Sequence, residues 1–163
     1  MIEHDALTDP ILTLHLPDAE ATGRLGAAFA TILNAGDTVL LDGQIGAGKT
    51  HFARSVIQEI LALHGIWEDV PSPTFTLVQT YEAEGVEIWH ADLYRLSNPS
   101  EVDELGLTDA FGNGLCFVEW PDRLGPHLPS DALRIAFRLY GDGRTARLYG
   151  DNRWAERLAG ADL

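Results

Sequence analysis

Residues 38–50 read TVLLDGQIGAGKT, and this stretch decides the fold. Residues 38–41 form a continuous apolar run, as expected for a strand that is buried on both faces. Residues 43–50 match G-x-x-x-x-G-K-T at every fixed position, and the helix expected over residues 49–64 follows at once, with apolar side chains at helical spacing. A strand, a glycine-rich loop and a helix in this order predict a P-loop.

A P-loop binds the phosphates of a nucleotide mainly through its backbone. Glycines allow the N–H groups to wrap the phosphates, and the N-terminus of the following helix adds partial positive charge. We expect Lys49 to reach the β- and γ-phosphates and the Thr50 hydroxyl to bind Mg²⁺. Lys49 is the only lysine among the eleven Lys and Arg residues of the chain. The expected ATP- or ADP-binding positions of the loop are Gly43, Ile45, Gly46, Ala47, Gly48, Lys49 and Thr50.

Two acids follow apolar runs and are candidate metal ligands. Asp92 comes after residues 86–91, and Glu119 comes after residues 115–118. Parallel strands would bring both carboxylates to the edge of the sheet that carries the P-loop, where Mg²⁺ needs oxygen ligands. Either acid alone is equally compatible with a helix cap or a solvated strand end. The pair favours a metal site in which Asp92 and Glu119 also serve catalysis, whereas His90 is more simply an interior histidine.

Further signals predict an α/β fold with antiparallel additions. Residues 71–74 read PSPT and predict a loop, because each proline removes a backbone donor. Thr74 in this loop is a candidate γ-phosphate sensor, together with the hydroxyls of Ser72 and Thr76; the alternative is an ordinary proline-rich turn. The remaining expected elements are strands over 12–16, 75–81, 86–91, 114–120, 132–140 and 144–149, helices over 21–33 and 99–111, and a short helix at the end of the chain.

Composition limits the classes of function. A chain of 163 residues predicts one domain, residues 1–163, and the net charge of −14 opposes direct binding of nucleic acid. Cys116 is the single cysteine, which excludes an intramolecular disulfide and a metal site with several thiolate ligands. Residues 1–10 do not resemble a signal peptide, and no apolar run reaches 18 residues. We expect a cytoplasmic protein without membrane contact.

The class of P-loop protein is narrowed by what the sequence lacks. The N-K-x-D element of guanine-selective GTPases is excluded, because Lys49 is the only lysine. Residues 103–106 match the D-x-x-G of GTPases, but they lie in an expected helix rather than after a strand. A small-molecule kinase usually has a lid rich in arginine, and the sequence contains no arginine-dense segment between two helices. An ATPase is favoured, and a non-catalytic nucleotide sensor that scaffolds a complex, or a kinase, stays open as an alternative.

The order of the motifs resembles the TsaE family, also called YjeE, of small bacterial P-loop ATPases. The matching pieces are GQIGAGKT at 43–50, SPTFTLVQTY at 72–81, HADLYRL at 90–96, ELG at 104–106 and VEWP at 118–121. They cover residues 17–121, about two thirds of the chain, and the combination is far more specific than any one piece.

The resemblance implies a P-loop fold with a parallel core sheet and antiparallel edge strands. It implies a role in making the threonylcarbamoyladenosine modification of tRNA, with the TsaD and TsaB proteins as partners, tRNA being held mainly by them. ATP binding and hydrolysis would reset that complex. By position, residues 46–50 hold the phosphates, Thr50 and Glu119 hold Mg²⁺, Asp92 is the acid needed for hydrolysis, Thr74 lies in the switch loop, and Trp120 and Ala19 lie near the nucleotide.

One position departs from the family pattern. His51 stands where the family more commonly has a second threonine, whose hydroxyl would lie near the α-phosphate. The backbone N–H of His51 and its imidazole can still donate, so we expect altered affinity rather than loss of binding. Arg54, Arg95 and Arg123 lie near the motifs, but the sequence assigns none of them to phosphate transfer, and a partner could supply that charge.

Overall fold

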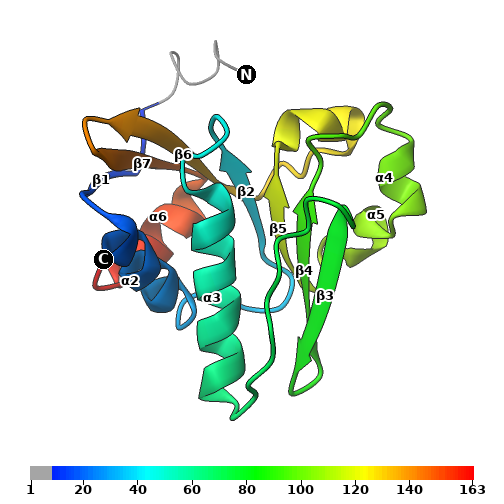
Figure 1. Cartoon of the computed structure of the whole chain (residues 1–163), viewed down its shortest axis with the longest axis horizontal. Coiled ribbons are helices and arrows are strands. Elements are labelled where there is room, and N and C mark those ends of the chain that lie inside the picture. Colours follow the sequence, from blue (N-terminus) through cyan, green and yellow to red (C-terminus); the bar gives the residue numbers. More distant parts are fainter. Residues whose placement is uncertain (1–8) are drawn as a thin grey trace.

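The computed structural model describes residues 9–163 and contains one seven-stranded sheet in the order β1-β7-β6-β2-β5-β4-β3 (Figure 1). The expectation about a signal peptide falls largely on residues outside this range. No helix within residues 9–163 is long and apolar enough to cross a membrane. The strands are β1 (Leu12–Leu16), β2 (Thr38–Asp42), β3 (Val78–Ala83), β4 (Val86–Asp92), β5 (Leu115–Glu119), β6 (Leu133–Tyr140) and β7 (Gly143–Tyr149).

The core of the sheet is parallel and its edges are antiparallel. Strands β6, β2, β5 and β4 run parallel, with β2 between β6 and β5. On one side β7 and then β1 are added antiparallel, and on the other side β3 is added antiparallel to β4. This confirms the expected fold class. The carboxyl ends of the four parallel strands meet at one edge, which is where ligands bind in open α/β sheets.

Both faces of the central strands are buried, as the apolar run at residues 38–41 predicts. Val39 and Leu41 pack on one face with α2 (Ala19–Phe29), α3 (Lys49–Leu63) and α6 (Asn152–Ala159). Leu40 packs on the opposite face, where α4 (Glu101–Glu104), α5 (Leu107–Ala110) and the 3₁₀ segment η1 (Pro121–His127) lie. Alternation along β2 therefore supplies two separate hydrophobic cores from consecutive residues.

The helix expected over residues 99–111 is wrong as a single element. The chain instead forms the two one-turn helices α4 and α5, with Gly106 between them at φ +86°. A Cβ at Gly106 would lie 3.2 Å from the Trp89 ring, so close packing adds to the left-handed backbone in requiring glycine. The acidic helical pattern continues past this residue and hides the break.

Two further boundaries differ from expectation. Strand β3 begins at Val78 instead of residue 75, because Leu77 donates to the Pro73 carbonyl in a turn and has φ +68°. Helix α2 spans Ala19–Phe29 instead of 21–33, and Asp18 caps it by accepting from the Ala21 amide. Past Phe29 the hydroxyl of Thr31 binds the Ala28 carbonyl, and the chain continues in turns.

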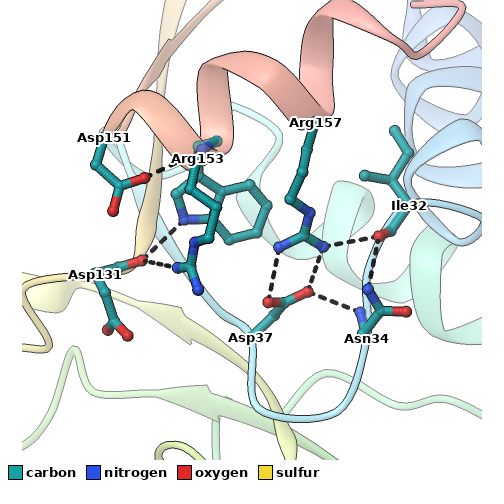
Figure 2. Close-up of polar contacts among 8 residues, drawn as sticks. Ile32, Asn34, Asp37, Asp131, Asp151, Arg153 and Arg157 are labelled. Carbon is teal, nitrogen blue, oxygen red and sulfur yellow. Dashed lines mark hydrogen bonds and ion pairs between the residues drawn. The ribbon is translucent and has the colours of Figure 1, made fainter.

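The last helix is fastened to the start of β2 by a bidentate ion pair (Figure 2). The guanidinium of Arg157 donates from Nη1 and Nη2 to the two Asp37 oxygens, at 2.9 and 2.7 Å, and also to the Ile32 carbonyl. Its ring neighbour Trp154 is fully buried and donates to the Asp131 carbonyl at 2.8 Å. The hydrogen bond to Asp37 raises the pKa of Arg157, so this pair stays charged.

Candidate functional site

A pocket of about 570 Å³ opens at the carboxyl edge of the parallel strands. This volume is within the usual range for sites of small ligands. The loop between β2 and α3 forms its floor, and the ends of β4 and β5 form one wall. The turn from β1 into α2 and the turn between β6 and β7 form the opposite wall. The topology thus assembles residues that lie more than a hundred positions apart in the chain.

Lys49 is held back inside this pocket. Its side chain is buried, its ammonium donates to the Gly43 carbonyl, and its Nζ lies 3.6 Å from the centroid of the Trp120 ring. Burial lowers the pKa of Lys49, and the nearby carboxylates of Glu119 and Asp92 partly oppose this effect. The cation is therefore desolvated and packed on an aromatic face, with its charge directed at the pocket that surrounds it.

A short chain of hydrogen bonds lies beneath the loop. The Thr50 hydroxyl donates to Glu119 Oε1 at 2.7 Å, and His90 Nε2 contacts Glu119 Oε2 at 2.7 Å. Both oxygens of Glu119 are thus engaged, and Glu119 and His90 are almost completely buried. Within residues 9–163, His90 Nδ1 has no hydrogen-bond partner. His90 is interior, as expected, but it also orients the carboxylate, which the sequence did not indicate.

Asp92 lies beside Glu119, because the two residues are paired in the register of β4 and β5. Its Oδ1 accepts from the Tyr94 amide at 3.0 Å, and its own amide donates to the Leu77 carbonyl in the proline-rich loop. Burial raises the pKa of Asp92, with a further contribution from the charge of Glu119, although the Tyr94 amide acts in the opposite direction. A carboxylate of raised pKa in a pocket is a candidate proton acceptor.

The oxygen atoms of Thr50, Asp92 and Glu119 fit a hard divalent cation. They come from one hydroxyl and two carboxylates that lie side by side at the pocket wall, without sulfur ligands. Mg²⁺ is usually held by one or two carboxylates together with phosphate oxygens. These three side chains are therefore a suitable set, and Lys49 would oppose a cation placed without phosphates.

The opposite wall comes from the side of the sheet that carries β6, β7 and β1. Ala19 and Thr22 line it from α2, and the His51 ring contacts the Ala19 carbonyl through Nε2 at 2.9 Å. Asp142 lines it from the turn between β6 and β7, and Arg144 lines it from the start of β7. His51 thus ties the start of α2 to the start of α3 and still faces the pocket.

Most of the expected positions converge on this pocket. Those that line it are Ala19, Ile45, Gly46, Gly48, Lys49, Thr50, His51, Thr74, Asp92, Glu119 and Trp120. Gly43 and Ala47 do not line it. The Gly43 carbonyl accepts a hydrogen bond from the Lys49 ammonium, and Ala47 is buried beneath the loop. Sequence reasoning missed Asp142 and Arg144, because nothing in a hairpin turn near the end of the chain signals that it reaches the loop at residues 43–50.

The arginines near the motifs hold loops. Arg54 donates from Nε to the Val70 carbonyl, and Arg95 donates to the carbonyls of Thr74 and Phe75 at 3.1 and 2.7 Å. Neither lines the pocket within the described part of the chain, and Arg123 does not line it either. Arg95 instead fixes the backbone on which Thr74 stands.

Comparison with known proteins agrees with this arrangement. A sequence model of the family described as "Threonylcarbamoyl adenosine biosynthesis protein TsaE" matches residues 16–147. The chain belongs to the TsaE family. A protein of Haemophilus influenzae named as TsaE is 35% identical over 156 residues, which cover 92% of this chain and 96% of that protein. The TsaE of Bacillus subtilis is 37% identical over 131 residues, covering 80% and 77%.

A solved structure supports the fold as well as the family. The crystal structure of Bacillus subtilis YdiB superimposes with a TM-score of 0.69 at 28% identity and covers 91% of each chain. The matched segment 16–147 includes the P-loop, both carboxylates and the turn between β6 and β7. By their names, TsaE proteins take part in the biosynthesis of threonylcarbamoyladenosine in tRNA.

Proposed function

We propose that this TsaE protein is a cytoplasmic ATPase that acts as an accessory subunit in the threonylcarbamoyladenosine modification of tRNA, together with TsaD and TsaB. The observation that carries the proposal is the chain from Thr50 through Glu119 to His90 directly below the P-loop, with Asp92 beside it. A loop that only bound nucleotide would not need Asp92, a second buried carboxylate, beside Glu119.

Each part of the site has a role in this proposal. The amides of residues 46–50 and the Lys49 ammonium bind the phosphates of ATP or ADP. Thr50, Glu119 and Asp92 hold Mg²⁺, which would neutralise charge on the phosphates. Asp92 would orient the attacking water and accept its proton. Thr74 closes over the γ-phosphate from the loop that Arg95 fixes.

The charge of the chain favours indirect contact with tRNA. A net charge of −14 gives little attraction to a phosphate backbone, so TsaD and TsaB would hold the tRNA. ATP binding and hydrolysis would then change the fit of this subunit to its partners, because the loop at residues 72–77 is bonded both to Asp92 and to Arg95.

The test is steady-state phosphate release from ATP, measured with and without the TsaD and TsaB proteins. We expect slow release by the chain alone, faster release with the partners, and a loss of at least about 100-fold for Asp92→Asn and Glu119→Gln. Asp109→Asn, an exposed acid of α5, is the matched control. Undetectable release under every condition, with nucleotide still bound, would leave a sensor and scaffold instead. Transfer of labelled γ-phosphate to a metabolite would identify a kinase.

A further inference from the structure

Arg144, the second residue of β7, contacts the P-loop although 98 positions separate it from Gly46. Its Nη2 donates to the Gly46 carbonyl at 3.0 Å, and its Nη1 donates to the Gly143 carbonyl at 3.0 Å. Gly46 has φ +82°, a left-handed conformation that favours glycine and that sets the direction of its carbonyl. The Arg144 side chain therefore holds the loop at a residue whose conformation decides the loop's shape.

The position of Arg144 follows from the topology of the sheet. Strand β6 is parallel to β2, so it ends at the edge that carries the P-loop, and the turn into β7 lies there. The register of β1 and β7 pairs Leu16 with Arg144. A Cβ at Gly143 would lie 2.6 Å from the Leu16 carbonyl, so the turn packs closely on the end of β1. Arg144 thus stands on a fixed backbone instead of a loose loop end.

The acidic side chains that line the pocket make a positive side chain besides Lys49 important for binding an anionic ligand. Four carboxylates line the pocket, those of Asp18, Asp92, Glu119 and Asp142. Within residues 9–163 only Lys49 and Arg144 bring opposite charge to that lining, when histidine is counted as neutral. A nucleotide with a highly charged phosphate chain would therefore enter a pocket with two formal positive and four negative charges. The single charge of Lys49 would balance only one of the four carboxylate charges.

The guanidinium has donors to spare. An arginine carries five N–H donors in a planar fork, and the two hydrogen bonds to Gly46 and Gly143 use two of them. Arginine forks bind phosphate oxygens in the same way as they bind carboxylates, and such charge-assisted bonds are about twice as strong as neutral ones. We propose that Arg144 is a nucleotide-positioning residue, which holds the P-loop through Gly46 and donates its other N–H groups to the phosphate chain.

The inference rests on the nucleotide binding in the proposed function but not on hydrolysis, so it is tested by binding alone. The variants are Arg144→Gln and Arg144→Lys, with Arg147→Gln as the matched control, an exposed arginine three positions further along β7. ADP affinity is measured calorimetrically in the presence of EDTA, so that metal ligands do not contribute. The rise in melting temperature given by inorganic pyrophosphate reports the phosphate contact without the nucleoside.

We expect Arg144→Gln to weaken ADP binding about tenfold or more and to remove most of the pyrophosphate effect. Arg147→Gln should match the wild type. Arg144→Lys should fall between them, because it keeps the charge and loses the fork. If Arg144→Gln does not fold, the test rests on Arg144→Lys. ADP affinity of Arg144→Lys equal to that of the wild type then overturns the proposal.

Three other results would overturn it. The first is ADP affinity of Arg144→Gln within twofold of the wild type. The second is an equal loss in Arg147→Gln. The third is weaker ADP binding with an unchanged pyrophosphate effect, because Arg144 would then act on the nucleoside. Failure of the proposed ATPase would instead show as absent phosphate release with these binding results intact. A wild-type protein that bound neither ADP nor pyrophosphate would overturn both.

Discussion

The Lys49 ammonium nitrogen lies 3.6 Å from the centroid of the Trp120 ring, and Trp120 has a left-handed backbone with φ +60°. A residue other than glycine in this conformation costs of order 1 kcal/mol or more, and such residues gather at functional sites. The turn directly after Glu119 therefore directs the indole over the P-loop cation. Phosphates that bind Lys49 compete with this aromatic contact.

Nucleotide binding should change the fluorescence of Trp120, because Lys49 would leave the indole face to contact phosphate. Addition of ADP to the wild type should shift or quench tryptophan emission. In Trp120→Phe the ring is kept, so ADP affinity should stay within about fivefold, the contact being worth ~1 kcal/mol. The emission change should disappear in that variant. An ADP-induced emission change in Trp120→Phe as large as that of the wild type would contradict the assignment, because it would come from the three remaining tryptophans.

His90→Leu should weaken Mg²⁺ binding by about 10- to 100-fold, the usual effect of removing a partner that orients a metal-binding carboxylate. The cause is the loss of the 2.7 Å contact between His90 Nε2 and Glu119. Calorimetric titration of Mg²⁺ into the ADP complex measures this affinity, and ADP binding in EDTA should be nearly unchanged. His15→Leu, an exposed histidine of β1, is the control. Equal Mg²⁺ affinity in wild type and His90→Leu would count against the role of His90.

Asp92→Asn should stabilise the protein without ligands at pH 8 while it abolishes ATP hydrolysis. The folded state raises the pKa of Asp92, so the folded protein holds this proton more strongly than the unfolded chain does. The contribution of Asp92 to stability is complete below its unfolded pKa and is lost as pH rises through the raised value.

Thermal unfolding measures this difference. We expect the melting temperature of Asp92→Asn to exceed that of the wild type at pH 8 and to match it near pH 3.5. Asp109→Asn, at an exposed acid of α5, is the matched control. A lower melting temperature for Asp92→Asn at pH 8 would contradict the prediction.

The bidentate ion pair between Arg157 of α6 and Asp37, just before β2, should contribute to the stability of the fold and have little effect on nucleotide binding (Figure 2). Arg157→Met leaves Asp37, whose side chain is only 9% exposed, without its bidentate partner. We expect a loss of ~2 kcal/mol, reduced from the value for a fully buried pair because Arg157 is partly solvated, and a fall in melting temperature of about 4–8 °C.

Arg153→Met is the control for that measurement, since Arg153 makes a single hydrogen bond of 3.2 Å to the Asp131 carbonyl. Its effect should be below about half of that of Arg157→Met. ADP affinity should be the same in both variants, because neither residue lines the pocket. Equal destabilisation by the two substitutions would show that the bidentate pair contributes nothing special.

The P-loop and the two carboxylates were predictable because each has a local signal. The glycines, Lys49 and Thr50 lie within eight residues, 43–50, and an acid at the end of an apolar run needs only a parallel sheet to reach the same edge. The break at Gly106 was not predicted, since the helical pattern of acids and apolar residues continues through it. Gly106 has a left-handed backbone there and packs closely on Trp89, which is a neighbour only in the folded chain.

The contacts of His90 and Arg144 were not predictable for the same reason. His90 reaches Glu119 because β4 and β5 are adjacent in a particular register, and a shift by one residue would turn it to the other face. Arg144 reaches Gly46 only because β7 returns beside β6. Pattern along a chain indicates the elements, but register between elements decides which side chains meet.

The pairing of β1 with β7 sets the order in which the protein can be completed. Leu12 pairs with Leu148, so β1 has no partner in the sheet until β7, more than a hundred residues later in the chain, has been synthesised. Such long-range closure slows folding and leaves an open edge for a time. The same pairing brings Arg144 to Gly46, so the strand that completes this side of the sheet also completes the wall of the pocket. Truncation before β7 would remove both the partner strand of β1 and the contact of Arg144 with Gly46.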